Sequence, residues 1–319
     1  YISVTGVQTC ALPIFFCTGA AMHTKRMRIG PMGWIVPLYD PLRIVEDVAV
    51  LDQILDGRLQ VGLVSGILPH YFIPYQADFP NRRARTNETI ALLKAAYAEK
   101  KPFSFHGEFY NYDNVTLSVS PVQKPHPPMW LQTRDPATLS LLAREGVHTG
   151  YLFFVAKDTA VPRYTEYLRQ WRAAGHAGDP KIAYWTLIYV DETDEKALAM
   201  ASKHAIHTWE DIGGFGDTGG VSSGVIADNL RKRGEPESAE IVSRIGDLPY
   251  LVGRNLVFVG SPETVTRQIR QAATEGMFNV LLGEFNFGFL ADEDVMRSVR
   301  LFGEKVMPQL RDLEVLPAR

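Results

Sequence analysis

The sequence predicts an α/β fold with a mainly parallel sheet. Segments rich in β-branched and apolar residues alternate with segments whose apolar residues recur every three or four positions. This alternation is typical of strands joined by helical crossovers. The chain has 319 residues, of which 46% are hydrophobic, enough apolar material for one large core. Because no linker-like segment divides the chain, we expect a single domain over residues 15–319.

The first fourteen residues differ in character from the rest. Residues 4–14, VTGVQTCALPI, resemble the in-frame translation of a common sequencing-library adapter. We therefore expect residues 1–14 to be non-native, and we exclude Val4–Ile14, with Cys10, from the fold prediction. Cys17 is then the expected native cysteine, and one cysteine forms no disulfide framework. The native sequence is predicted to start near Phe15, inside a helix.

In the first half of the chain, the predicted elements follow from apolar patterning and from turn residues. Pro41 suits the first position of a helix, and Gly57 suits the cap that ends it. The remaining elements are strands at Met27–Pro37 and Arg58–Ser65, a helix at 82–99, and an aromatic-rich hairpin or extended excursion at 103–119.

The second half continues the alternation. It holds strands at 129–133, 150–155, 182–190 and 278–284, and helices at 136–145, 160–174, 194–206, 262–276 and from 292 onward. Counted from Met27, this gives six strands, which can also form an open doubly wound sheet. A dinucleotide-binding sheet needs a G-x-G-x-x-G turn after a strand. Gly62–Gly66 does not have that pattern, and the glycine-rich Gly213–Gly216 follows a predicted helix, which weakens that alternative. An insertion is expected near 211–250, and its Gly/Ser-rich part, Gly213–Gly224, is either a surface loop or a lid over a ligand.

Composition excludes several classes of protein. With 33 basic and 36 acidic residues the net charge is −3, and no basic block indicates a nucleic-acid partner. No apolar segment approaches the roughly 20 residues of a membrane span. We expect a cytoplasmic protein without a metal site. His204 and His207 have a spacing that can bind metal, but without a third ligand we predict a solvated helix face.

Three segments resemble the bacterial-luciferase-like family of flavin-dependent monooxygenases. Lys25–Gly66 has the spacing PLxDPLRxxEDxxxLDQxxxGRxxxG, Phe105–Gly146 contains PVQKPHPPMW, and Val259–Leu310 contains GSPETVTRQIRQAATEG and LFGEKVMPQL. The resemblance implies a TIM (β/α)8 barrel in which Met27 begins the third strand, so the first two strands are expected to be missing. It also places a histidine at the end of the second strand. No residue here matches that histidine, and the catalytic residues are therefore left unknown.

The resemblance further implies an activity. We expect a monooxygenase of the alkanal-monooxygenase type, which uses reduced FMN and molecular oxygen to oxidise a small organic substrate. A flavin reductase would supply the reduced FMN, and a homodimer would fit the family. Three alternatives stay open. They are a deazaflavin-dependent oxidoreductase that transfers hydride, an inactive flavin-binding protein, and an incomplete barrel whose unpaired edges make it unstable.

Candidate cofactor residues follow from the rule that barrel enzymes place their chemistry at the carboxyl ends of the strands. At Met32-Gly33 the resemblance implies a backbone lying against the flavin ring, often through a non-prolyl cis peptide. At the next strand end, the family's luciferase has a cysteine and an arginine where this chain has Val64 and Ser65. Val64 is expected to pack on the ring and Ser65 to donate a hydrogen bond to phosphate, while Gly66 leaves space for the cofactor.

A second group, Thr133-Arg134-Asp135, precedes a predicted helix. A helix N-terminus binds anions, so this group is expected to hold phosphate, with Arg134 replacing the cation missing after Val64. The alternative is that Asp135 only caps the helix. The substrate pocket is predicted to be lined by Trp34, His70, Phe153, Phe154 and Phe285.

Overall fold

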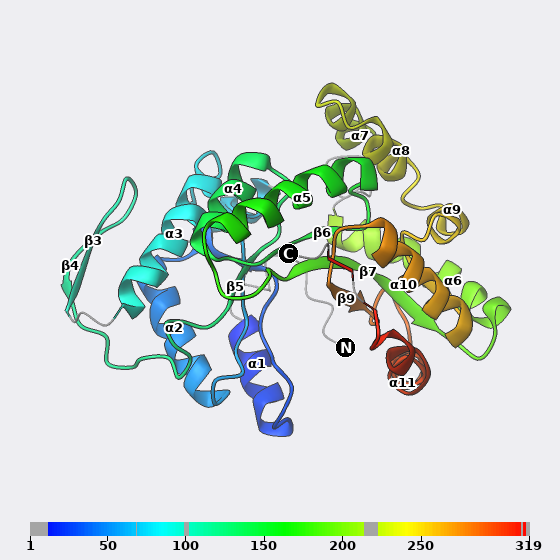
Figure 1. The fold of residues 1–319 in the computed structure, drawn as a ribbon, viewed down its shortest axis with the longest axis horizontal. Helices are drawn as coiled ribbons and strands as arrows, with labels where there is room; N and C mark the ends of the chain where they lie inside the picture. The colour runs from blue at the N-terminus through cyan, green and yellow to red at the C-terminus, as the bar shows by residue number, and fades with distance from the viewer. Residues whose placement is uncertain (1–11, 68, 99–101, 214–222, 314, 317–319) are drawn as a thin grey trace. The chain divides into compact units, whose positions relative to one another are not determined.

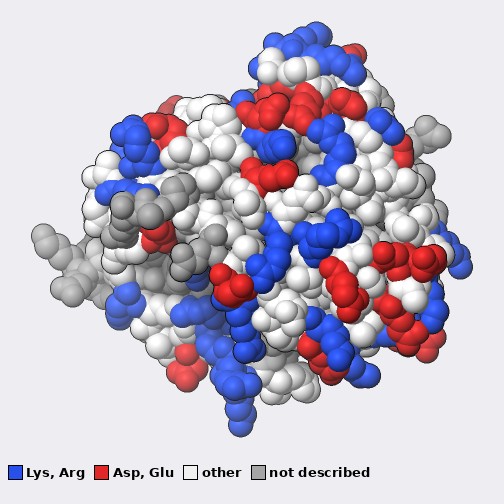
Figure 2. Space-filling model, turned by 45° about the vertical axis from the view of Figure 1, so that its right-hand side comes forward, with Lys and Arg blue, Asp and Glu red and all other residues white. Residues whose placement is uncertain are grey.

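The computed structural model describes residues 12–67, 69–98, 102–213, 223–313 and 315–316 (Figure 1). The chain forms two compact units, Tyr1–Gln132 and Thr133–Arg319. Most of the segment expected to be non-native lies outside the described residues, and Leu12–Ile14 begin the first helix. Within the described parts, no helix is both long and apolar enough to cross a membrane. Acidic and basic side chains lie interspersed over the face shown in Figure 2.

The first unit is built around a parallel sheet of order β1-β2-β5. Its elements are α1 (Leu12–His23), β1 (Trp34–Ile35), η1 (Val36–Leu38), α2 (Pro41–Ile54), β2 (Val61–Val64), η2 (Pro69–Tyr71), η3 (Ile73–Tyr75), α3 (Arg82–Tyr97), β3 (Phe103–His106), β4 (Asn111–Val115) and β5 (Met129–Leu131). The predicted strand Met27–Pro37 is shortened to Trp34–Ile35. Pro31 has no N–H to donate to a ladder, and Pro37 begins a 3-10 turn.

Helix α2 begins where the sequence predicts. Asp40 caps it, since its Oδ1 accepts a hydrogen bond from the Leu42 amide at 2.9 Å, and Pro41 occupies the first turn. Its buried face includes Ile44 and Val48. The helix ends at Ile54, three residues before the predicted cap. Gly57 instead serves the following turn with a φ of 73°, which a glycine adopts without strain.

The predicted hairpin is confirmed, and it lies beside α3 (Figure 1). Its tip is held by the carboxylate of Glu88 on α3. The amides of Glu108, Phe109 and Tyr110 donate to this carboxylate at 2.8–3.1 Å. Gly107 is required at this point, because an added Cβ would lie 1.9 Å from Glu88 Oε1. The hairpin thus depends on one charged acceptor.

We expect Glu88→Ala to release the hairpin tip, because three amides then lose a charged acceptor, each such bond contributing about 1.5–3 kcal/mol. Limited proteolysis should cut residues 103–115 faster than in the wild type, with little change elsewhere. Gly107→Ala should have a similar effect by displacing Glu88. Glu46→Gln, which changes an exposed carboxylate on α2 of the same unit, is the surface control. A hairpin as resistant in both variants as in the wild type would contradict this role of Glu88.

In the second unit every strand runs parallel to the long strand β7. Its elements are α4 (Pro136–Glu145), β6 (Thr149–Leu152), α5 (Lys157–Ala173), β7 (Ile182–Val190), α6 (Asp194–Gly213), α7 (Ser223–Lys232), α8 (Pro236–Ser243), α9 (Leu248–Gly253), β8 (Phe258–Gly260), α10 (Pro262–Glu275), β9 (Val280–Glu284), α11 (Asp292–Leu301), the π-helical turn η4 (Phe302–Val306) and η5 (Met307–Leu310). The parallel pairing confirms the predicted sheet type. Strand β8 was missed, and it brings the paired parallel strands among the described residues to seven.

The region between α6 and β8 is mostly helical where the structure describes it. Of the Gly/Ser-rich stretch, residues 214–222 lie outside the described residues. Helices α7 and α8 pack on each other around a small apolar cluster, against which Phe154 also packs. Helix α8 is further fastened by Ser238, whose Oγ accepts a hydrogen bond from the Ala156 amide at 3.1 Å. The described residues of the region expected to hold an insertion therefore form helices within the second unit, and the insertion itself stays a prediction.

Candidate functional site

In the first unit, the candidate residues Met32-Gly33 precede β1, and Val64-Ser65-Gly66 lie at the end of the neighbouring strand β2. The two sets lie at different heights along the strand direction. Val64, at the end of β2, pairs with Ile35. Met32 lies earlier, beside Gly62, where an added Cβ would approach the Met32 Cα to 2.5 Å. The structure therefore places Met32-Gly33 about two residues below Val64-Ser65 along the strand direction.

The expected cis peptide at Met32-Gly33 is wrong. Among the described residues the cis bond is Lys124-Pro125, so the peptide between Met32 and Gly33 is trans. Gly33 is exposed, and a Cβ built on it would meet no atom within 4 Å. Packing within the chain therefore does not demand a glycine at position 33, and its surroundings are open.

Gly66 is explained by its own conformation and by packing. Its φ is 74°, and an added Cβ would come within 2.7 Å of the Phe72 ring. The space next to this Cα is thus filled by an aromatic side chain. The half-buried Ser65 lies between Gly66 and the end of β2. Whether Val64, Ser65 and Gly66 contact a cofactor stays a prediction.

Sequence reasoning missed a cation at the end of β2. Arg82 Nε donates to the Gly66 carbonyl at 3.0 Å and Nη1 donates to the Phe79 carbonyl at 2.9 Å, with the guanidinium 3.8 Å from the centre of the Phe79 ring. Burial, and then the charge of Arg83, lowers the pKa of Arg82. The signal was present as paired arginines opening the helix after the strand. A guanidinium therefore does stand near Ser65.

In the second unit, Asp135 caps α4 as the simpler interpretation predicted. Its Oδ2 accepts hydrogen bonds from the Thr138 amide at 2.9 Å and from Thr138 Oγ1 at 2.8 Å. Thr133 Oγ1 accepts from the Asp135 amide at 3.1 Å, and the Tyr164 hydroxyl donates to the Thr133 carbonyl at 2.5 Å. Because a first-turn amide is already engaged, an anion at this helix end depends largely on side chains.

Arg134 supplies such a side chain within a buried cluster. Arg163 Nη2 lies 3.1 Å from Glu235 Oε1, and Arg163 Nη1 donates to the Arg134 carbonyl at 2.9 Å. Arg134 Nη1 is 3.8 Å from Glu235 Oε2, and this buried nitrogen has no hydrogen-bond partner. Burial lowers the pKa of Arg134, while Glu235 opposes that shift. An unsatisfied buried N–H costs about 1–3 kcal/mol, so an anionic acceptor would stabilise this position.

The aromatic residues predicted to line a substrate pocket are engaged in packing. Trp34 is 1% exposed and its ring meets Tyr39 edge-on, and Phe153 is 2% exposed. The Phe285 ring lies 5.0 Å from the Phe302 ring in a T-shaped contact. Their part in substrate binding stays a prediction. The side chain of His70, in η2, lies outside the described residues.

The expectation for His204 needs a correction. Its side chain is 9% exposed, so it does not lie on a solvated helix face. The side chain of His207 is outside the description. No group of three or more His, Cys, Asp or Glu that could hold a metal ion occurs among the described residues. Cys17 is buried, and burial raises the pKa of its thiol to about 11, which makes it unreactive at neutral pH.

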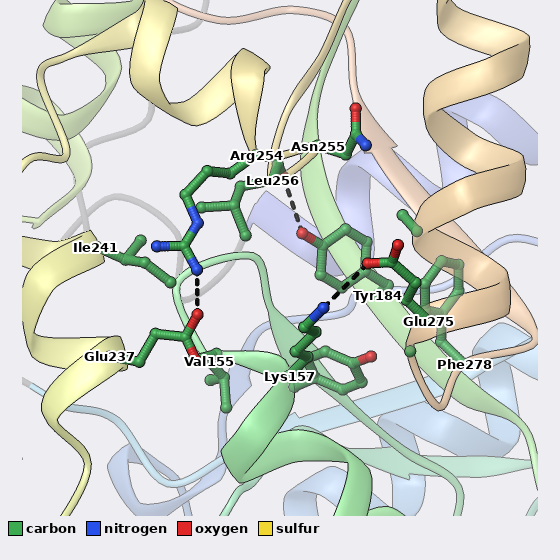
Figure 3. A pocket seen from close by; sticks show the side chains of 14 residues that line it. Val155, Lys157, Tyr184, Glu237, Ile241, Arg254, Asn255, Leu256, Glu275 and Phe278 are labelled. Atoms are coloured by element: carbon green, nitrogen blue, oxygen red, sulfur yellow. Dashed lines mark hydrogen bonds and ion pairs between the residues drawn. The ribbon is translucent and has the colours of Figure 1, made fainter.

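A cavity of about 130 Å3 opens in the second unit between α5, α8, α9 and α10 (Figure 3). Two ion pairs border it. Lys157 Nζ lies 3.2 Å from Glu275 Oε2, and Arg254 pairs with Glu237. Pockets for cofactor-sized molecules are typically 300–1,000 Å3. This cavity is too small for a flavin, and each of its basic side chains already has an acidic partner.

Glu284 is a titratable group at a strand end that sequence reasoning passed over. It is the last residue of β9, where it pairs with Leu187 of β7. Burial raises the pKa of Glu284 to about 7, although a hydrogen bond from Trp185 acts in the opposite direction. At neutral pH this carboxyl is therefore close to half protonated.

Comparison with known proteins places these features in a family. The profile of the luciferase-like monooxygenases matches residues 5–278. The FMNH2-dependent dimethylsulfone monooxygenase of Pseudomonas putida is 28% identical over 282 residues, which cover 86% of this chain and 72% of that protein. The chain covers different shares of its curated relatives. A second relative is 27% identical to this chain, which spans only 57% of that relative's length.

Solved structures agree on the fold. The oxygenating component of 3,6-diketocamphane monooxygenase from Pseudomonas putida, in complex with FMN, superposes with a TM-score of 0.74 at 19% identity, covering 96% of this chain and 85% of that one. The coenzyme F420-dependent tetrahydromethanopterin reductase of Methanopyrus kandleri reaches 0.60 at 19% identity, covering 93% and 87%. These likenesses show a fold of the TIM-barrel class. Together with the profile match, they establish that the chain belongs to the luciferase-like monooxygenase family.

Proposed function

We propose that the protein is a flavin-dependent monooxygenase that uses reduced FMN and molecular oxygen to oxidise a small organic substrate. Family membership and the FMNH2-dependent relative support the reaction class. The observation that carries the cofactor assignment is the buried Arg134 Nη1, which lacks an acceptor at the N-terminus of α4. A flavin phosphate is an acceptor of the right charge for that position.

The proposed roles are stated for each unit by itself. In the second unit Arg134 holds the phosphate, the Thr133 hydroxyl donates to it, and Asp135 keeps the helix end in place. In the first unit Met32, Gly33, Val64, Ser65 and Gly66 form the proposed flavin-contact group. When bound, the reduced flavin supplies the electrons for oxygen activation, while the protein orients the reactants and excludes water. A separate reductase would supply the reduced flavin.

We expect Arg134→Gln to weaken binding of reduced FMN by about tenfold or more, since a charge-assisted bond to phosphate contributes roughly 1.5–3 kcal/mol. Reduced riboflavin, which has no phosphate, should bind the variant and the wild type equally. Anaerobic titrations followed by flavin fluorescence measure both affinities. Arg144→Gln, at the exposed end of α4, is the matched control. Equal loss for both flavins would remove Arg134 from the phosphate site.

The same titration separates the alternative functions. The structural likeness to an F420-dependent enzyme makes a deazaflavin the second candidate cofactor. Exclusive binding of the reduced deazaflavin coenzyme would move the proposal to hydride transfer. Binding of reduced FMN that yields no oxygenated product with any of a panel of small apolar substrates in air would favour a flavin-binding protein without turnover.

A further inference from the structure

We propose that Glu235 is an internal counter-anion of Arg134 and Arg163, and that it lowers the affinity of the second unit for the phosphate of its cofactor. The inference rests on the proposed function, because it takes Arg134 as the phosphate contact. Glu235 would then determine how strongly the site distinguishes a phosphorylated flavin from an unphosphorylated one.

The carboxylate of Glu235 faces the two guanidinium groups of Arg134 and Arg163. Its side chain is 5% exposed, and although the residue precedes α8, it makes no capping hydrogen bond to that helix. Oε1 lies 3.1 Å from Arg163 Nη2. Oε2 lies 3.8 Å from Arg134 Nη1, too far for a hydrogen bond, and both of these atoms are buried without hydrogen-bond partners. The two unsatisfied atoms therefore lie opposite each other without forming a hydrogen bond.

The charges around Arg134 are unequal. Burial is the main cause that lowers the pKa of Arg134, and the charges of Arg233 and Arg163 lower it further, while Glu235 alone among the carboxylates acts to raise it. Arg134 and Arg163 both lie against the single carboxylate of Glu235, and the charge of Arg233 also acts on Arg134. A phosphate dianion bound beside Arg134 would be attracted by these cations and repelled by Glu235. The anion and Glu235 compete for the same guanidinium groups.

Helix α8 has other attachments that do not involve Glu235. Ser238 Oγ accepts from the Ala156 amide at 3.1 Å, and Glu237 pairs with Arg254. Ala239 and Val242 are buried in the apolar cluster with α7. Because these contacts persist when the Glu235 charge is removed, Glu235→Gln should fold with α8 docked. The variant therefore isolates the charge from the architecture.

The test is the affinity of Glu235→Gln for reduced FMN and reduced riboflavin under anaerobic conditions. We expect reduced FMN to bind Glu235→Gln at least about threefold more tightly than it binds the wild type, because a repulsive charge in a partly buried site has been removed. Riboflavin affinity should not change. Glu240→Gln removes the same charge from an exposed position on the same helix and should leave both affinities unchanged. Unchanged or weaker FMN binding by Glu235→Gln overturns the inference.

A second measurement on the wild-type protein does not depend on the stability of a variant. If phosphate competes with Glu235, amides of residues 223–243 should exchange hydrogen faster with reduced FMN bound than with reduced riboflavin bound. Equal or slower exchange with FMN counts against competition. Arg134→Gln distinguishes a failure of the proposed phosphate site from a failure of the proposed role of Glu235. If it leaves FMN affinity unchanged, the proposed phosphate site fails, whereas a loss in Arg134→Gln without a gain in Glu235→Gln refutes the role of Glu235 alone.

Discussion

Gly62→Ala should destabilise the first unit by about 3 kcal/mol or more, because its new methyl group would meet backbone rather than a movable side chain. A Cβ at Gly62 would lie 2.3 Å from the Pro31 carbonyl oxygen and 2.5 Å from the Met32 Cα. The same backbone accepts the Gly62 amide hydrogen bond, at 2.8 Å. The segment before β1 would have to move away from β2. The midpoint of urea unfolding, monitored by tryptophan fluorescence, measures the effect.

Gly33→Ala provides the matched control, since it adds the same methyl group one residue after Met32 but into open space. Its free energy of unfolding should stay within about 0.5 kcal/mol of that of the wild type. If both variants unfold at the same urea concentration, the close approach of the two backbones is not what requires a glycine at position 62.

Glu284→Gln should abolish a pH-dependent loss of stability. The pKa of Glu284 is raised from 4.5 to about 7 in the folded protein, so between these values the folded state binds more protons than the unfolded state. The loss of folding stability caused by ionising Glu284 is absent below pH 4.5, grows as the pH rises toward 7, and is then constant. At 1.36 kcal/mol per pKa unit it reaches up to about 3 kcal/mol at pH 8. Glutamine has no such penalty.

Urea unfolding of the wild type and Glu284→Gln at pH 5 and pH 8 tests this difference. The variant should have nearly the wild-type stability at pH 5 and be the more stable protein at pH 8. Glu304→Gln removes an exposed carboxylate and should show no comparable divergence. A variant that is equally stable relative to the wild type at both pH values would show that Glu284 does not carry this titration.

Elements with strong local signals were predictable from the sequence. Helix α4 and strand β7 have the predicted bounds, because Asp135-Pro136 mark a helix start and nine consecutive strand-forming residues make up β7. Strand β8 was missed since its three residues are too few to establish a period, and its pairing depends on β7, more than 60 residues away in the chain. The strand at 27–37 was overestimated because Pro31 has no N–H to donate and Pro37 begins a 3-10 turn, so the segment pairs at Trp34–Ile35 and in an isolated bridge from Ile29 to Leu59.

The cofactor roles of the candidate residues stay predictions, and the contacts around those residues were not predictable from the sequence. The strand-end rule selects Ser65 and Arg134, and both lie next to polar groups that bear on anion binding. It does not reveal Arg82, which reaches the end of β2 from the following helix, or Glu235, which is about a hundred residues from Arg134 in the sequence. Long side chains that act across sequence-distant elements have no local pattern, so only the three-dimensional structure identifies them.

The first turn of α8 joins two places in the second unit. Glu235 reaches the arginines beside α4, and Glu237, two residues later, reaches Arg254 at the border of the small cavity. A rigid displacement of this turn changes both ion pairs together. If Glu235 acts as proposed, sequence changes at the cavity border would alter phosphate affinity at the other end of the turn without changing an arginine there.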